Sequence, residues 1–209
     1  MEIKSISDLY RFKLFIFDLD NTIYKEEDYL FQGYNAIAQY LARDSGPISK
    51  RVLLNKLKSI YQLEGREKLF NKLIAEFNLD PKYVSECIDL LHSFSVDEPL
   101  KIIPAVRNLL FSLRNMNKTV FILTNGNIIQ QKNKVNNIQW GDLGGNFKFV
   151  FADELEPKPS PAGVEYILRT SHSKKEDTIL IGDSETDYMC ALNSGIDYLN
   201  VREILRYNF

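Results

Sequence analysis

Short apolar runs that each end at a polar residue recur along the chain. Four of them cover residues 14–17, 120–123, 149–152 and 179–181, and a further short strand is expected at 198–201. Nearly continuous apolar runs of this length are typical of strands buried on both faces, and such strands form parallel sheets covered by helices. We therefore predict that these runs are strands of one parallel sheet.

Helix-like stretches lie between these runs. They cover residues 104–115, 127–137 and 160–171. Strands that alternate with helices predict an α/β core with right-handed crossover connections. The predicted fold class is therefore α/β, with a parallel sheet flanked by helices.

Residues 27–97 interrupt this alternation. Apolar side chains recur there in three groups, which are Leu53, Leu54, Leu57 and Ile60, then Leu69, Leu73, Ile74 and Phe77, and then Val84, Cys87, Ile88 and Leu91. This spacing is typical of amphipathic helices. We predict an all-α insertion at 27–97 between the first and second core strands, so that residues 1–26 and 98–209 form the α/β core.

Composition limits the class of protein. The 209 residues are 44% hydrophobic, enough to bury a core, and the formal net charge of -2 favours neither a nucleic-acid nor a membrane partner. No apolar stretch approaches the roughly 18 residues that span a bilayer, and the first residues lack a signal-peptide pattern. Cys87 and Cys190 have no metal-like spacing, so we expect reduced, structural thiols. A cytoplasmic location is the resulting expectation.

The residues that follow the strands carry the candidate chemistry. Ligands of open parallel sheets bind outside the carboxyl ends of the strands, so these residues are expected to lie together. In chain order they are Asp18 and Asp20, then Thr124, Asn125 and Gly126, then Lys158, and then Asp183 and Asp187. Taken singly, each is explained as a turn, cap or loop residue, and residues 184–187 have the pattern of a capping box.

Taken together, these segments resemble the four motifs of the haloacid dehalogenase-like hydrolase superfamily in order and spacing. The four are DLDNT at 18–22, LTNG at 123–126, Lys158, and GDSETD at 182–187. The resemblance covers the whole chain, because the helical insertion is similar to the C1-type cap of the family. It implies a Rossmann-like sheet with an inserted all-α cap, and the chain looks most like the branch of nucleotidases and sugar-phosphate phosphatases.

The resemblance implies a role for each acidic motif. Asp18 would be the nucleophile that forms an aspartyl phosphate, and Asp20 would be the general acid and base. Mg²⁺ would be the cofactor, with ligands from the Asp18 side chain, the Asp20 backbone carbonyl and the Asp183 side chain. Asp187 would have an outer role, orient Lys158, or cap its helix.

The resemblance also implies how substrate is bound. Phosphoryl oxygens would be bound by Lys158, by the Thr124 hydroxyl and by the backbone N–H groups of Asn125 and Gly126. The expected substrate is a small phosphorylated metabolite, such as a nucleoside monophosphate or a sugar phosphate, and small organic-acid phosphates are also admissible. Candidates for setting its specificity at cap or hinge positions are Tyr24, Tyr61, Arg66 and Lys68.

Three alternative functions differ in their chemistry. A dehalogenase expels a halide, which leaves without a proton, so the second acid at Asp20 favours phosphoryl transfer. A phosphomutase of the β-phosphoglucomutase type shares the same core acids and stays open. A catalytically silent binding domain on the same fold also stays open, although no expected group is missing. The sequence contains no indication of the oligomeric state.

Overall fold

The computed structural model describes residues 6–145 and 147–206, and the chain forms two compact units. The first unit consists of Met1–Glu26, Leu100–Gln131 and Ile138–Phe209. The second consists of Glu27–Pro99 together with Lys132–Asn137. Within the described ranges, none of the helices has the length and apolar character needed to cross a membrane.

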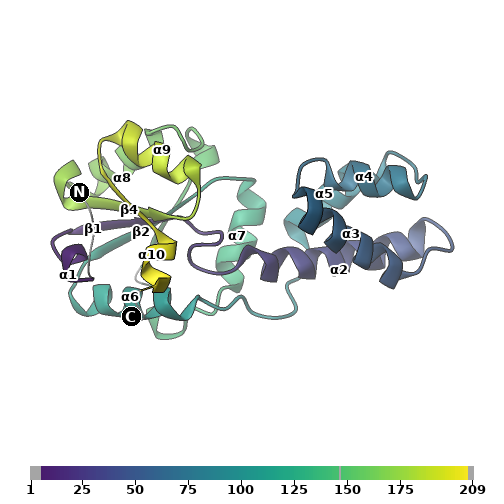
Figure 1. Cartoon of the computed structure of the whole chain (residues 1–209), viewed down its shortest axis with the longest axis horizontal. Helices are drawn as coiled ribbons and strands as arrows, with labels where there is room; N and C mark the ends of the chain where they lie inside the picture. The colour runs from purple at the N-terminus through teal and green to yellow at the C-terminus, as the bar shows by residue number, and fades with distance from the viewer. Residues whose placement is uncertain (1–5, 146, 207–209) are drawn as a thin grey trace. The chain divides into compact units, whose positions relative to one another are not determined.

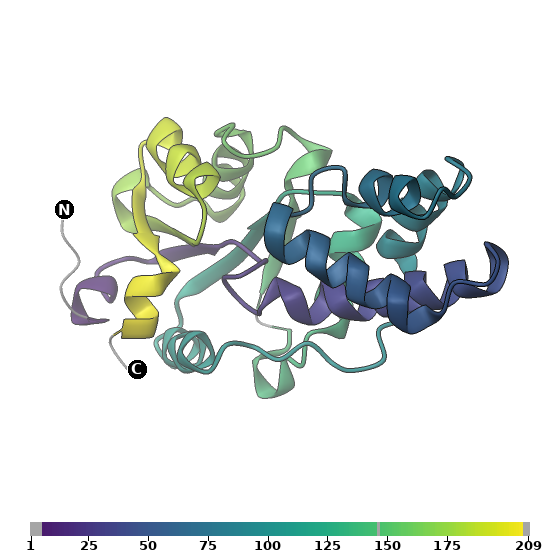
Figure 2. The same cartoon turned by 45° about the vertical axis from the view of Figure 1, so that its right-hand side comes forward.

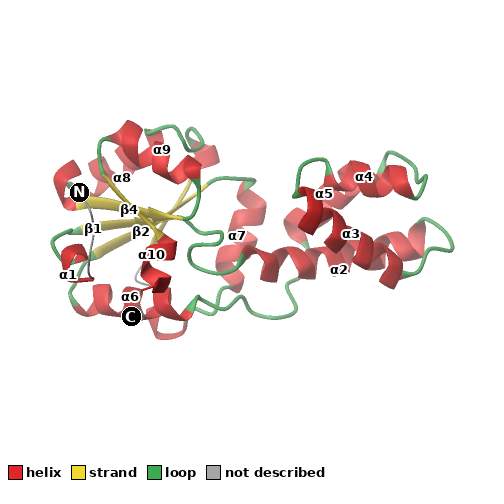
Figure 3. Ribbon diagram, in the orientation of Figure 1, coloured by secondary structure: helices red, strands yellow, loops and turns green. Residues whose placement is uncertain are grey.

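A five-stranded parallel sheet forms the centre of the first unit, as the apolar runs predict (Figure 3). The strand order is β3-β2-β1-β4-β5. The strands are β1 (Leu14–Phe17), β2 (Thr119–Thr124), β3 (Lys148–Phe151), β4 (Thr178–Gly182) and β5 (Asp197–Asn200). The central strand β1 pairs with β2 and β4, and Phe15 lies opposite both Val120 and Ile179. This order brings the ends of β1, β2 and β4 side by side.

Helices cover both faces of the sheet. In both views α8 (Ala162–Ser171) and α9 (Glu185–Ser194) lie on one face and α6 (Pro104–Asn115) on the other (Figures 1 and 2). Leu14 and Ile16 of β1 belong to the buried cluster that packs against α8 and α9. The fold class predicted from the alternation is confirmed.

Several element boundaries differ from the prediction. The third strand ends at Phe151, because Ala152 begins the 3-10 helix η2 (Ala152–Glu154). The last strand ends at Asn200 rather than residue 201, because the Asn200 side chain accepts a hydrogen bond from the Arg202 N–H and starts α10 (Val201–Arg206). Helix α8 begins at residue 162 rather than 160.

The remaining elements of the first unit are short, apart from α7. They are α1 (Ile6–Leu9), η1 (Gly141–Leu143), η3 (Lys175–Asp177) and the first residues of α7 (Ile128–Asn137). Asn127 precedes α7, and its side-chain oxygen accepts hydrogen bonds from the N–H groups of Ile129 and Gln130. This contact fixes where α7 begins, as expected for an Asn at the helix N-cap.

The second unit is built from helices in its described residues. They are α2 (Glu26–Asp44), α3 (Lys50–Glu64), α4 (Leu69–Glu76), α5 (Tyr83–Ser93) and the last residues of α7. Leu53, Leu57 and Ile60 of α3 are buried, as their helical spacing predicts. The ammonium of Lys134 is buried within this unit, 5.3 Å from the centre of the Tyr29 ring.

The two cysteines are free and buried, as predicted. Burial raises the pKa of Cys87 to about 12 and that of Cys190 to about 11. Both groups are therefore protonated thiols at neutral pH, and they pack as small apolar side chains.

Candidate active site

A buried lysine joins two of the predicted acids in the first unit. The Nζ of Lys158 donates hydrogen bonds to Asp18 Oδ1 at 2.6 Å, to Asp187 Oδ1 at 2.5 Å and to the Leu123 carbonyl at 3.1 Å. An ammonium has three donors, so all three are used. Burial would lower the pKa of Lys158, but the two carboxylates raise it above its ordinary value. Lys158 is therefore a fixed positive charge.

The backbone of Lys158 is held by Asn125. The Asn125 side chain donates to the Lys158 carbonyl at 2.8 Å and accepts from the Lys158 N–H at 2.9 Å. This double contact ties the loop that carries Lys158 to the end of β2. The Asn125 amide therefore positions the lysine, while the sequence pattern predicts phosphate binding by the backbone N–H of the same residue.

Asp187 both orients Lys158 and caps its own helix. Its Oδ1 accepts from Lys158, and its Oδ2 accepts from the Ser184 backbone N–H at 3.2 Å and from the Ser184 hydroxyl at 2.5 Å. The Ser184 hydroxyl in turn accepts from the Asp187 N–H, so the predicted capping box at the start of α9 is present. Two of the roles left open for this residue are thus fulfilled together.

The absence of a side chain at Gly182 leaves the space that the Asp187 carboxylate occupies. Gly182→Ala is expected to displace that carboxylate. A methyl group at Gly182 would lie 2.5 Å from Cγ and Oδ2 of Asp187, well inside van der Waals contact. We expect a loss of about 1–3 kcal/mol in the free energy of unfolding, the usual cost of overpacking, measured by urea denaturation. Gly144→Ala is the comparison variant, because its added methyl would have a much smaller overlap, with the Gly141 carbonyl oxygen at 3.3 Å as its nearest neighbour. Equal stability of the two variants would contradict the steric argument.

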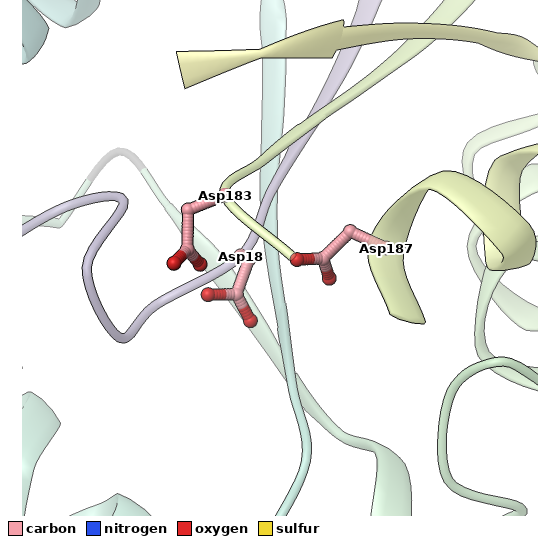
Figure 4. Close-up of side chains that lie close together, drawn as sticks. All are labelled: Asp18, Asp183 and Asp187. Atoms are coloured by element: carbon pink, nitrogen blue, oxygen red, sulfur yellow. The ribbon is translucent and has the colours of Figure 1, made fainter. Parts of the chain in front are cut away.

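Three carboxylates cluster at this edge of the sheet. Asp18 follows β1, Asp183 follows β4 and Asp187 lies in the first turn of α9, with one oxygen of each within 4.8 Å of the others (Figure 4). Burial raises the pKa of Asp18 to about 7, with Asp187 and Asp20 adding to this effect and Lys158 opposing it. Burial and Asp187 also raise the pKa of Asp183.

This donor set fits a divalent cation that prefers oxygen ligands. Asp187 already accepts three hydrogen bonds, from Lys158 and from the N–H and hydroxyl of Ser184, so we expect Asp18 and Asp183 to be the carboxylates that would coordinate a metal. A cation between them would favour their charged forms and offset the cost of burying them. One or two carboxylates plus a substrate oxygen is a typical environment for Mg²⁺.

Asp20 is half-buried and receives two side-chain hydrogen bonds. The Tyr24 hydroxyl donates to its Oδ1 at 2.5 Å, and the Gln131 amide donates to its Oδ2 at 3.3 Å. Tyr24 is fully buried in the first unit. Its hydroxyl is thus directed at Asp20, whereas the sequence suggested a role for Tyr24 in specificity.

The loop after β2 contains the predicted phosphate-binding residues. Thr124 is buried at the end of the strand, and Gly126 has a φ of +113°, a conformation that favours glycine. The Gly126 N–H donates to Asp153 Oδ1 at 2.9 Å. A carboxylate therefore occupies the donor that the sequence pattern assigned to phosphate, so an incoming phosphoryl group would have to replace Asp153 there.

The three cap candidates lie in the second unit. Tyr61 is half-buried on α3, with its ring centre 5.8 Å from that of Phe31 and 6.1 Å from that of Tyr34. Arg66 and Lys68 are exposed, and Lys68 precedes α4 with a left-handed backbone. Their role in specificity stays a prediction.

Gln131 and Asp153 contact the site but were not predicted from the sequence. One weak sequence signal could have pointed to Gln131 as a site residue. It is a polar residue one helical turn after the Asn127 cap, and it follows the LTNG motif closely. Asp153 lies in η2 and is exposed, so its pattern does not differ from that of an ordinary loop acid. Both are recognised only through their contacts.

Comparison with known proteins agrees with this geometry. The family model described as haloacid dehalogenase-like hydrolase matches residues 15–201. The chain is 25% identical to glyceraldehyde 3-phosphate phosphatase of Pyrococcus furiosus over 181 residues, which are 83% of this chain and 73% of that protein. The corresponding Pyrococcus abyssi phosphatase is 23% identical over 177 residues, 82% of this chain and 73% of that protein.

Solved structures share the fold at low sequence identity. CbbY of Rhodobacter sphaeroides in complex with phosphate is 15% identical with a TM-score of 0.61, covering 90% of this chain and 85% of that one. A candidate β-phosphoglucomutase of Thermotoga maritima is 20% identical with a TM-score of 0.60, covering 93% of this chain and 97% of that one. At these identities the likeness concerns the fold.

Proposed function

Because the chain belongs to the haloacid dehalogenase-like hydrolase family, we propose that it is a Mg²⁺-dependent phosphatase of small phosphorylated metabolites. The observation that carries the proposal is the buried Lys158, whose ammonium lies between Asp18 and Asp187 at the end of the central strand. A fixed cation beside a carboxylate is what an anionic nucleophile needs to approach an anionic phosphoryl group. The second acid at Asp20 supports phosphate chemistry over halide displacement.

The reaction would use two displacements at phosphorus. An Asp18 oxygen attacks phosphorus, the bond from phosphorus to the ester oxygen breaks, and Asp20 gives that oxygen a proton. Asp20 then takes a proton from a water molecule, which attacks phosphorus and breaks the bond to Asp18, so that inorganic phosphate leaves. Lys158 holds Asp18 and offsets its charge throughout.

The metal would be held by the side chains of Asp18 and Asp183 and by the backbone carbonyl of Asp20. When bound, Mg²⁺ supplies positive charge that offsets the phosphoryl oxygens. Thr124 and the N–H of Asn125, at the end of β2, would contact those oxygens. The Gly126 N–H would join them once Asp153 has been displaced.

The substrate class is inferred from the relatives and the second unit. The names of the two Pyrococcus relatives, glyceraldehyde 3-phosphate phosphatases at 25% and 23% identity, support a sugar phosphate. A nucleoside monophosphate is the second class, and Tyr61, Arg66 and Lys68 are the side chains we propose for contacting either one. A cytoplasmic location also stays a prediction from the sequence.

Phosphate release in the presence and absence of metal tests the proposal. The purified chain is incubated with 4-nitrophenyl phosphate, glyceraldehyde 3-phosphate, hexose phosphates and nucleoside monophosphates, with Mg²⁺ or with EDTA. We expect release that requires Mg²⁺, with a sugar phosphate having the highest kcat/KM. If no phosphate in the panel is hydrolysed with Mg²⁺, Mn²⁺ or Co²⁺, the alternative of a catalytically silent binding domain is favoured and the proposed function is wrong.

The same panel separates hydrolysis from phosphomutase activity. A phosphomutase returns the phosphoryl group to another hydroxyl of the sugar, so the phosphorylated sugar is isomerised and little inorganic phosphate appears. A phosphatase gives one phosphate for each sugar released. Following the sugar phosphates by ³¹P NMR distinguishes the two outcomes.

A further inference from the structure

Both oxygens of the Asp20 carboxylate accept a hydrogen bond from a side chain. Tyr24 donates to one oxygen at 2.5 Å and Gln131 to the other at 3.3 Å. Both side chains are buried, with Tyr24 0% and Gln131 2% exposed. Two buried donors therefore restrict the torsions of a side chain that lies in a turn after β1.

The Tyr24 hydroxyl is fixed by the backbone around it. Tyr24 forms a parallel bridge with Asp20 and an antiparallel bridge with Ile102, and the Ile103 N–H donates to the Ile23 carbonyl at 2.9 Å. Because these contacts lie on either side of Tyr24, they fix the position of its backbone, from which the ring extends. With its backbone fixed and its side chain fully buried, Tyr24 donates its hydroxyl to Asp20 from a restricted position.

Gln131 links Asp20 to the loop after β2. Its Nε2 donates to the Asn125 carbonyl at 2.5 Å as well as to Asp20. Gly126 makes room for this amide, because a methyl group there would lie 2.9 Å from Nε2. One side chain therefore sets the position of Asp20 relative to the loop proposed to bind phosphate.

The other end of the Gln131 amide is costly for the fold. No donor among the described residues reaches its Oε1, which is buried. A buried acceptor without a partner destabilises the folded state, and an apolar side chain of similar size would avoid that cost. The buried Oε1 thus lowers stability, and what the glutamine supplies in return is its two donor contacts, with Asp20 and with the Asn125 carbonyl.

We propose that Tyr24 and Gln131 are positioning residues that hold Asp20 for proton transfer to the leaving-group oxygen. The proposal rests on the proposed phosphatase function. General acid catalysis requires the acid within hydrogen-bond reach of the departing oxygen, and a freely rotating carboxylate spends much of its time elsewhere. Each carboxylate oxygen has two lone-pair positions, so neither of these two hydrogen bonds by itself uses up the oxygen that it reaches. Tyr24 and Gln131 keep their own protons.

Leaving groups of different basicity test the proposal through kcat/KM, which covers the steps up to leaving-group release. An alkyl phosphate from the substrate panel needs a proton on its departing oxygen, whereas 4-nitrophenyl phosphate does not. We expect Tyr24→Phe and Gln131→Met each to lower kcat/KM for the alkyl phosphate by about tenfold or more, a part of the roughly 10² to 10⁴ that acid catalysis contributes. For 4-nitrophenyl phosphate the expected loss is less than about threefold, because no protonation is required.

Matched variants separate positioning from a general loss of structure. Tyr29→Phe removes the hydroxyl of another fully buried tyrosine, which donates to the Leu91 carbonyl, and Gln130→Met changes the neighbouring buried glutamine of α7. Neither is expected to change the ratio of the two kcat/KM values. In an Asp20→Asn background, Tyr24→Phe and Gln131→Met should have no further effect on this ratio, since the group that they position can no longer donate as an acid.

The outcomes are distinct. If the wild type releases phosphate and the ratio is unchanged in Tyr24→Phe and Gln131→Met, the positioning proposal is wrong and the phosphatase function stands. If Tyr24→Phe or Gln131→Met changes the ratio of the two kcat/KM values as much in the Asp20→Asn background as in the wild type, the positioning proposal is also wrong. If the wild type hydrolyses no phosphate of the panel with Mg²⁺, Mn²⁺ or Co²⁺, the proposed function fails, and the positioning roles fail with it.

Discussion

Asp18→Asn is expected to reduce phosphate release by about 10⁴-fold or more, because it removes the nucleophile of the proposed reaction. An amide oxygen does not displace an alcohol from phosphorus, so no covalent intermediate can form. The substitution keeps the shape of the side chain at a position that is buried beside Lys158. The measurement is kcat for 4-nitrophenyl phosphate with Mg²⁺, compared with the wild type.

The fold of Asp18→Asn should survive the substitution. Asp18 lies in a cluster with Asp183 and Asp187, so neutralising it removes repulsion, and Lys158 retains its ion pair with Asp187. Near-equal urea denaturation midpoints would establish this point. Asp177→Asn, at an exposed ion pair with Lys13, is the control and should retain full activity. More than about a hundredth of wild-type turnover in the Asp18→Asn variant, with reversion to the acid excluded by mass spectrometry, would contradict a nucleophilic role, for which losses are far larger.

Lys158→Met is expected to affect both stability and turnover. It leaves Asp18 and Asp187 facing each other without the cation between them, and breaking a buried ion pair in this way typically costs about 3–5 kcal/mol. Turnover should fall by about 10³-fold, because charge on the phosphoryl group is no longer offset. Lys13→Met removes an exposed partner of Asp177 and should cost less than about 1 kcal/mol.

The loss in the free energy of unfolding caused by Lys158→Met should be larger at high pH than at low pH. The folded pKa of Asp18 is already raised to about 7, and losing the ammonium that opposes this shift raises it further. Between the ordinary carboxyl pKa and this higher value the folded state binds more protons than the unfolded state, so stability rises as pH falls. We expect the stability gap to the wild type, measured by urea denaturation, to be smaller at pH 5 than at pH 8. A gap of constant size would show that the loss is one of packing and not of charge.

Much of the fold was predictable from local pattern. The strands have short, continuous apolar runs because a central parallel strand is covered on both faces, and all four side chains of Leu14–Phe17 are buried. Errors concerned element ends, such as the start of α8 and the end of β5, and the short helices α1 and α10, which were not predicted. Those ends depend on individual caps, such as the Asn200 contact with the Arg202 N–H, which periodicity does not reveal.

The candidate site was predictable to the extent that it follows strand ends. Asp18, Thr124 and Asp183 come at or directly after β1, β2 and β4, and parallel pairing brings these ends together. The hydrogen-bond partners of the site residues were harder to predict from the sequence. The contact of Gln131 with Asp20 spans 111 positions and that of Asp153 with Gly126 spans 27, and neither has a sequence pattern of its own.

The amino-acid sequence by itself therefore determined the class of fold, the positions of the strands and the identities of the acids and the lysine at their ends. These properties depend on local hydrophobicity and on the chain order of polar residues. Only the tertiary structure decided which donor meets which acceptor: Lys158 between Asp18 and Asp187, and Tyr24 and Gln131 on Asp20. Such pairs depend on strand register, loop conformation and burial, which bring together side chains that are distant along the chain.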